Sequence, residues 1–133
     1  MDRMSNYEAV AEWHEYAERD LVSAKHLLNM HPVPLEIVAY LCQQCGEKYL
    51  KSYLIYHDQD VVKTHNLSFL QNLCIKFDES FGVLDEQCRI LTKYINDSRY
   101  PSKLELTDYH TKQAIEYAEE IKSFVSDRIA EEN

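Results

Sequence analysis

Hydrophobic residues recur along most of the chain at alternating spacings of three and four, which is the period of an α-helix. Over residues 7–30 this pattern places Val10, Ala17 and Leu21 on one side, and acidic residues occupy much of the remainder. The segment 35–56 differs, because its residues 37–42 are apolar on every side. The pattern therefore predicts an amphipathic helix followed by a central helix that is buried on most faces.

Three further segments show the same period. Asn66 is a suitable N-cap for a short third helix, a fourth helix is expected over about 83–96, and Thr107 or Asp108 caps a fifth that ends near Ala130. The stretches between them are expected to be loops or turns. The pattern predicts an all-α fold, an antiparallel helical bundle of about five helices. It forms one domain over residues 1–133, with its core at about 7–130.

Composition narrows the class of protein. The chain has 133 residues, 45% of them hydrophobic, which suits one core, and it has only two glycines and three prolines. A β-sandwich or a glycine-rich phosphate loop needs more of both. No apolar segment follows the N-terminus, so the four cysteines indicate reduced thiols in a cytoplasmic protein without a membrane span. Cys42 and Cys45 lie in the most apolar run, which favours a core role over zinc, and no metal is expected.

The charge distribution says more than its total of −9. Residues 1–47 carry eight acidic and three basic groups, and residues 113–133 carry six and two. Residues 48–112 are balanced, with nine of each. A general basic face for nucleic acid is therefore not expected, which makes RNA a less favoured partner. A small basic site in the central segment stays open.

One polar stripe interrupts the apolar second helix. Gln44, Glu47, Lys48 and Lys51 follow one another at i, i+3, i+4 and i+7. One interpretation is a weak Glu47–Lys51 surface pair, and another is the seam of a homodimer. A third joins Lys48 and Lys51 to Arg99, beside Tyr100, in a site for nucleotide phosphate or for an acidic surface of a partner protein.

Four clusters together resemble one known family. They are Asp20-Leu21-x-x-Ala24, Gln44-x-x-Glu47-Lys48-x-x-Lys51, His65-Asn66-Leu67 and Arg99-Tyr100-Pro101. In order and spacing, over about residues 7–130, they resemble the HEPN domain. The resemblance implies an all-helical homodimer, in bacteria and archaea often paired with a minimal nucleotidyltransferase in a toxin–antitoxin-like module. It implies a non-catalytic component that binds a nucleotide or a partner protein, and no cofactor apart from such a nucleotide.

A second branch of that family consists of metal-independent endoribonucleases, whose signature is an arginine, four to six residues and a histidine. Here His110 follows Arg99 only after ten residues, so this signature is absent and the chain is not expected to be an enzyme. The alternative is an endoribonuclease in which Arg99 steadies the phosphate and His110 or His65 exchanges protons. Otherwise, His65 and Asn66 simply start the third helix.

Tyrosines are numerous, and three of them share one side of the second helix. Tyr49, Tyr53 and Tyr56 follow at i, i+4 and i+7. Such a surface is typical of a homodimer or partner groove, since tyrosine supplies a large contact area. Packing inside the bundle is the equal alternative.

Overall fold

The structure is a computed structural model that describes residues 3–97 and 106–133. These residues form five α-helices and one 3₁₀ helix, and no strand occurs among them. The all-α prediction is therefore confirmed. No helix in this part of the chain is long and apolar enough to cross a membrane. In chain order the elements are α1 (Arg3–Leu27), α2 (Leu35–Tyr56), α3 (Leu67–Ile75), η1 (Glu79–Leu84), α4 (Asp85–Asp97) and α5 (Asp108–Glu132).

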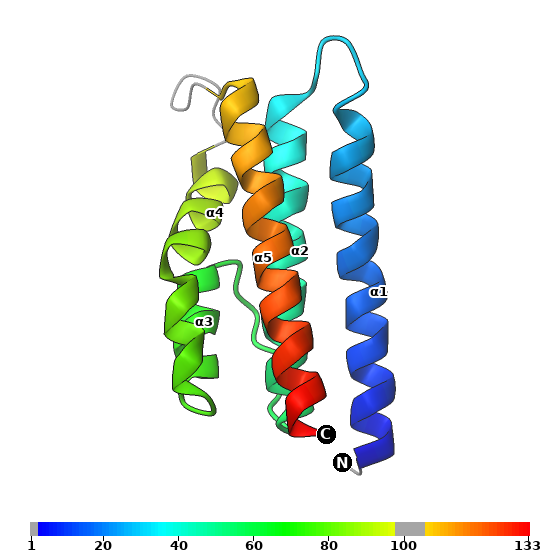
Figure 1. Cartoon of the computed structure of the whole chain (residues 1–133), viewed down its shortest axis with the longest axis vertical. Coiled ribbons are helices and arrows are strands. Elements are labelled where there is room, and N and C mark those ends of the chain that lie inside the picture. The colour runs from blue at the N-terminus through cyan, green and yellow to red at the C-terminus, as the bar shows by residue number, and fades with distance from the viewer. Residues whose placement is uncertain (1–2, 98–105) are drawn as a thin grey trace.

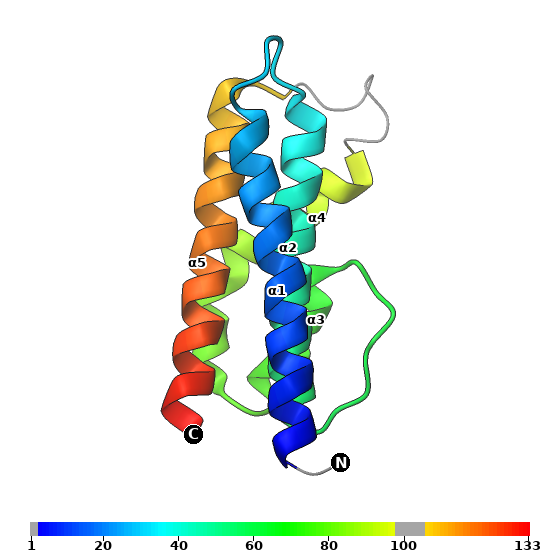
Figure 2. The same cartoon turned by 90° about the vertical axis from the view of Figure 1, so that its right-hand side faces the viewer.

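The three long helices α1, α2 and α5 lie side by side as a bundle (Figure 1). The helices α1 and α2 run in opposite directions, whereas α5 runs in the same direction as α2 because α3, η1 and α4 lead the chain back first (Figures 1 and 2). Helix α2 contacts α1, α3, α4 and α5. It is therefore the central helix, as its continuous apolar run predicted.

Prolines and N-cap residues determine where most of the helices begin. Helix α2 has the bounds that the sequence predicted, and Pro34 precedes it directly. Asn66 caps α3, because its side-chain Oδ1 accepts a hydrogen bond from the backbone N–H of Phe69 at 3.0 Å. Thr107 is the N-cap of α5. The expected turn near residues 78–82 is instead the 3₁₀ helix η1, so α4 begins at Asp85, two residues later than predicted.

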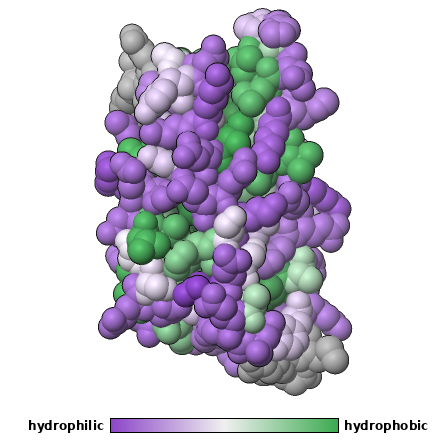
Figure 3. All heavy atoms as spheres, in the orientation of Figure 1, coloured by the Kyte–Doolittle hydropathy of each residue, from purple (hydrophilic) through white to green (hydrophobic). Residues whose placement is uncertain are grey.

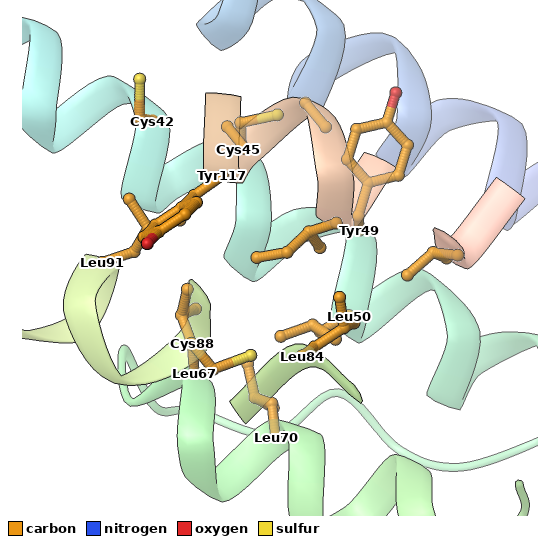
Figure 4. Packing of buried hydrophobic residues seen from close by; sticks show 14 of the residues in the cluster. Cys42, Cys45, Tyr49, Leu50, Leu67, Leu70, Leu84, Cys88, Leu91 and Tyr117 are labelled. Carbon is orange, nitrogen blue, oxygen red and sulfur yellow. The ribbon is translucent and has the colours of Figure 1, made fainter. Parts of the chain in front are cut away.

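The core lies between α2 and the helices around it. The outer surface seen in Figure 3 is mostly hydrophilic, and hydrophobic atoms show chiefly in the seams between helices. Inside, leucines of α2, α3, η1 and α4 pack together in one cluster (Figure 4). Gly46 allows this close packing, since a Cβ there would lie 3.1 Å from Ile121 Cδ1 and 3.2 Å from Leu67 Cδ1.

The cysteines and tyrosines of the central helix belong to this core. All four cysteines of the chain are buried free thiols, and burial raises the pKa of Cys42 and of Cys88 to about 12. They therefore stay protonated and pack as apolar side chains. Tyr49, Tyr53 and Tyr56 are also buried within the subunit. Packing inside the bundle, rather than an outer tyrosine surface, is their observed use.

A histidine joins the two longest helices of the N-terminal half. His14 Nε2 of α1 lies 2.8 Å from the hydroxyl oxygen of Ser52 on α2, and the His14 ring packs against Tyr49 at 4.8 Å between centroids. The Ser52 hydroxyl already donates to the Tyr49 carbonyl at 2.7 Å. The Nε2 atom must therefore be the donor toward Ser52.

Burial lowers the pKa of His14 below its ordinary value of 6.5. The unfolded chain then binds a proton at this site more readily than the folded chain. The stabilisation is complete above about pH 6.5 and is lost as the pH falls through the lowered pKa of the folded state. We expect the free energy of unfolding to fall less between about pH 7.5 and 5.5 in His14→Gln than in the wild type. Urea unfolding at each pH measures this.

The exposed His26 supplies the control for this effect. His26→Gln removes an imidazole from the same helix without touching the contact between His14 and Ser52, so the effect of His14 should persist in this variant. Equal pH dependence of His14→Gln and the wild type would show that His14 does not titrate as its burial requires.

Candidate functional site

The polar stripe of α2 is mostly enclosed by the bundle. Glu47 and Lys51 are buried, at 5% and 7% exposure, and Gln44 and Lys48 are half-buried. The neighbouring Gln43 is buried as well. A polar group removed from water costs free energy unless it is hydrogen-bonded, and a charge costs more. The partners of these side chains therefore decide what the stripe can do.

Glu47 is the centre of a small polar cluster. Its Oε2 accepts from the ammonium of Lys51 at 2.9 Å, and its Oε1 lies 2.8 Å from Nδ1 of His65. The side-chain amides of Gln43 and Gln44 also point to Oε1, each at 3.4 Å. The interpretation of Glu47 and Lys51 as an i, i+4 pair is thus observed, but the pair is buried rather than on the surface. We call these five residues the Glu47 cluster.

His65 reaches the cluster from the loop that precedes α3. Its backbone carbonyl accepts from the amide of Gln43 at 2.6 Å, so the histidine is held at two points. A carboxylate only accepts, which makes Nδ1 the proton-bearing atom in this contact. The side chain of His65 is nevertheless 63% exposed. The result is an imidazole that a carboxylate orients and that solutes in water can reach.

Lys48 does not join this cluster. Its ammonium lies 2.5 Å from Oδ2 of Asp20 on α1, so it ties the two antiparallel helices together. The structure therefore divides the predicted stripe into two parts. Asp20 and Glu47 balance the formal charges of Lys48 and Lys51, and the described part of the site has no surplus positive charge.

Two further predicted residues, Arg99 and Tyr100, lie outside the described residues, so their roles stay predictions. His110 is described, and it has a local structural role. Its Nδ1 accepts from the backbone N–H of Thr107 at 3.1 Å and lies 3.0 Å from the Thr107 hydroxyl, as part of the capping box of α5. This cap occupies one of the two ring nitrogens that the endoribonuclease alternative would use.

Two members of these contacts did not stand out in the sequence. Gln43 precedes Glu47 by four residues, so helical spacing alone would have placed them together. The sequence points to Asp20 only as part of the cluster Asp20-Leu21-x-x-Ala24. Its pairing with Lys48 depends on how α1 crosses α2. The contact between His65 and Glu47 depends on the path of the loop 57–66, for which the sequence has no periodic signal.

These helices and contacts define a class of protein: an all-helical domain around one central helix whose polar groups are held by neighbouring residues. The sequence model of one family, the HEPN domain, matches residues 10–129. That is nearly the whole chain, and the chain therefore belongs to the HEPN domain family. The family suggested by the four sequence clusters is confirmed. A comparison with curated proteins finds no match.

Proposed function

We propose that this chain is a non-catalytic component of a two-component module, toxin–antitoxin-like in type, in which a HEPN domain acts with a minimal nucleotidyltransferase. It works as a cytoplasmic homodimer and binds its partner protein rather than a nucleotide. Family membership supports the first part. One observation carries the preference for a protein: Lys48 and Lys51 each contact a carboxylate of their own subunit, at 2.5 and 2.9 Å.

The energy of the buried pair explains this preference. A nucleotide phosphate that recruited Lys51 would leave Glu47 buried without its cation. Breaking a buried ion pair from one side costs about 3–5 kcal/mol. A ligand with a Kd of about 1 mM gains only about 4 kcal/mol on binding, so this cost would cancel most of that free energy. A protein partner can bind elsewhere on the surface and leaves the pair intact.

The reading frames beside the gene and their products test the proposal. We expect a small nucleotidyltransferase to be encoded there, and its purified product to form a complex with this chain in size-exclusion chromatography and calorimetry. The complex should form without added nucleotide. A neighbouring nucleotidyltransferase that shows no association, or a gene neighbourhood that lacks one, would contradict the proposal.

One specific observation favours a second candidate, the metal-independent endoribonuclease. His65 is accessible, and the Glu47 carboxylate orients it as carboxylates orient the imidazole of hydrolytic sites. In this candidate His65 takes the proton of a ribose 2′-hydroxyl and Arg99 steadies the phosphate. It requires RNA cleavage in excess EDTA that disappears in His65→Ala and persists in His26→Ala. The leading proposal expects no cleavage by the purified wild type between about pH 6 and 8, where histidine titrates.

A further inference from the structure

A shallow groove runs between α5 and the junction of η1 with α4, on a side of α5 that the Glu47 cluster does not touch. Its volume is about 790 Å³. The apolar side chains that line it are Val83 and Leu84 of η1 with Ile115 and Phe124 of α5. Figure 3 shows a hydrophobic patch left of centre, at about the height of the α3 label in Figure 1. Val83 is 68% exposed and is the most exposed of the apolar residues that line the groove.

Acidic side chains of α5 form the rim of this groove. Glu116, Glu120 and Asp127 are exposed along it, and Glu119 lines it as well. Of the described residues in the lining, Lys112 is the single cation. The carboxylates at positions 116, 120 and 127 follow α5 at i, i+4 and i+11. They span about 17 Å at 1.5 Å per residue, which is the length of three helical turns.

The other cations of α5 form ion pairs with residues outside the lining, and Arg128 also lies over the ring of Phe124, 5.3 Å from its centroid. Lys122 donates to Glu18 of α1 at 2.6 Å, and Arg128 pairs with Glu131 at 2.7 Å. Glu119 is paired with Lys25 of α1 at 3.1 Å. Among the described residues that line the groove, four carboxylates therefore outnumber one lysine, and the groove keeps a negative field beside its apolar residues.

We infer that this groove, called the α5 groove below, docks a basic amphipathic helix of a partner protein. The apolar side of such a helix covers Val83 and Phe124, and its lysines or arginines meet the carboxylates of the rim. The inference rests on the proposed function only in taking the partner to be a protein. The charges are the opposite of those expected from the sequence, where basic residues of this chain contact an acidic surface of the partner.

A second copy of this chain and a nucleic acid both have the wrong charge to bind in the α5 groove. A second copy of this chain has a net charge of −9, and its own α5 carries seven acidic and three basic residues. Docking α5 of a second copy into the groove would bring like charges together, which disfavours association. Nucleic acid is disfavoured for the same reason, since its phosphates need a basic face.

The test uses a labelled helical peptide of about 18 residues, with leucines on one face and lysines at the i, i+4 and i+11 positions of the other. Fluorescence anisotropy measures its binding to the full chain. We expect saturable binding that weakens at least about tenfold in the double variant Glu116→Lys/Glu120→Lys and also weakens in Val83→Ser. A peptide with glutamate in place of lysine should not bind.

The matched control is Glu8→Lys/Glu36→Lys, which changes the charge of two exposed residues far from the groove by the same amount. It should bind the peptide within about twofold of the wild type. Equal weakening in both double variants would mean attraction to overall charge and would overturn the inference, as would no binding by the wild type. Circular dichroism confirms that all variants stay helical.

Two outcomes identify a different occupant. A concentration-dependent dimer in sedimentation that the Glu116→Lys/Glu120→Lys variant abolishes would assign the groove to a second copy and overturn the inference. Binding of a uridine oligonucleotide in place of the peptide would assign the groove to RNA and would also overturn the inference. If the peptide binds in the groove but the neighbouring nucleotidyltransferase shows no association, the proposed function fails while the α5 groove stands.

Discussion

Replacing Glu47 with leucine is expected to lower the free energy of unfolding by about 3–5 kcal/mol. The carboxylate is 5% exposed and accepts from Lys51 at 2.9 Å and from His65 at 2.8 Å. Leucine removes both acceptors and leaves the Lys51 ammonium buried without a counter-ion. The loss of the His65 contact also frees the loop before α3 from one of its two attachments to α2. Urea unfolding followed by circular dichroism measures the change.

The double variant Glu47→Leu/Lys51→Met is the control for this prediction. Replacing both partners of a buried ion pair with apolar groups of similar volume is often neutral or even stabilising. The double variant should therefore recover most of the stability that Glu47→Leu loses. A Glu47→Leu variant within about 1 kcal/mol of the wild type would mean that Lys51 is solvated and that the cluster is open to water.

The second large effect is expected at Phe81, in the middle of η1. Its ring is fully buried and packs against Tyr53 at 4.4 Å and Phe124 at 4.9 Å between centroids. Phe81→Ala removes these contacts and leaves a cavity, at a cost of about 3–5 kcal/mol. Because η1 also supplies Val83 to the α5 groove, the variant should weaken peptide binding as well. Urea unfolding and peptide anisotropy measure the two effects.

Phe69 gives the matched control, since its side chain on α3 is 49% exposed. Phe69→Ala should cost only about 1 kcal/mol, because about half of this side chain stays in water in the folded chain. Similar losses in Phe81→Ala and Phe69→Ala would contradict the packing of η1 between α2 and α5.

The sequence predicted the fold to the extent that local patterns determine it. The bounds of α2 were predicted correctly because Pro34 stops the preceding segment and the helical period then continues to Tyr56. The segment around Phe81 was expected to be a turn. Its 3₁₀ helix depends on a distant contact, because Gln71 of α3 donates to the Phe81 carbonyl at 2.9 Å. No periodicity near residues 78–84 indicates that partner.

The same limit applies to the site. Helical spacing placed Glu47 beside Lys51, but spacing says nothing of burial, and a weak surface pair was one of three interpretations that it left open. The loop before α3 brings His65 to Glu47, and the direction of Lys48 comes from its contact with Asp20 of α1. The sequence therefore predicted which residues carry charge, whereas tertiary packing decided which charges remain free.

The central claim is that the lysines of α2 are neutralised inside their own subunit and do not bind a nucleotide. Calorimetric titration of the purified chain with ATP and with GTP, at low ionic strength, tests this most directly. We expect no saturable heat at nucleotide concentrations up to about 1 mM, where a phosphate site of useful affinity would be occupied. Saturable binding that is lost in Lys51→Met or Lys48→Met would contradict the account.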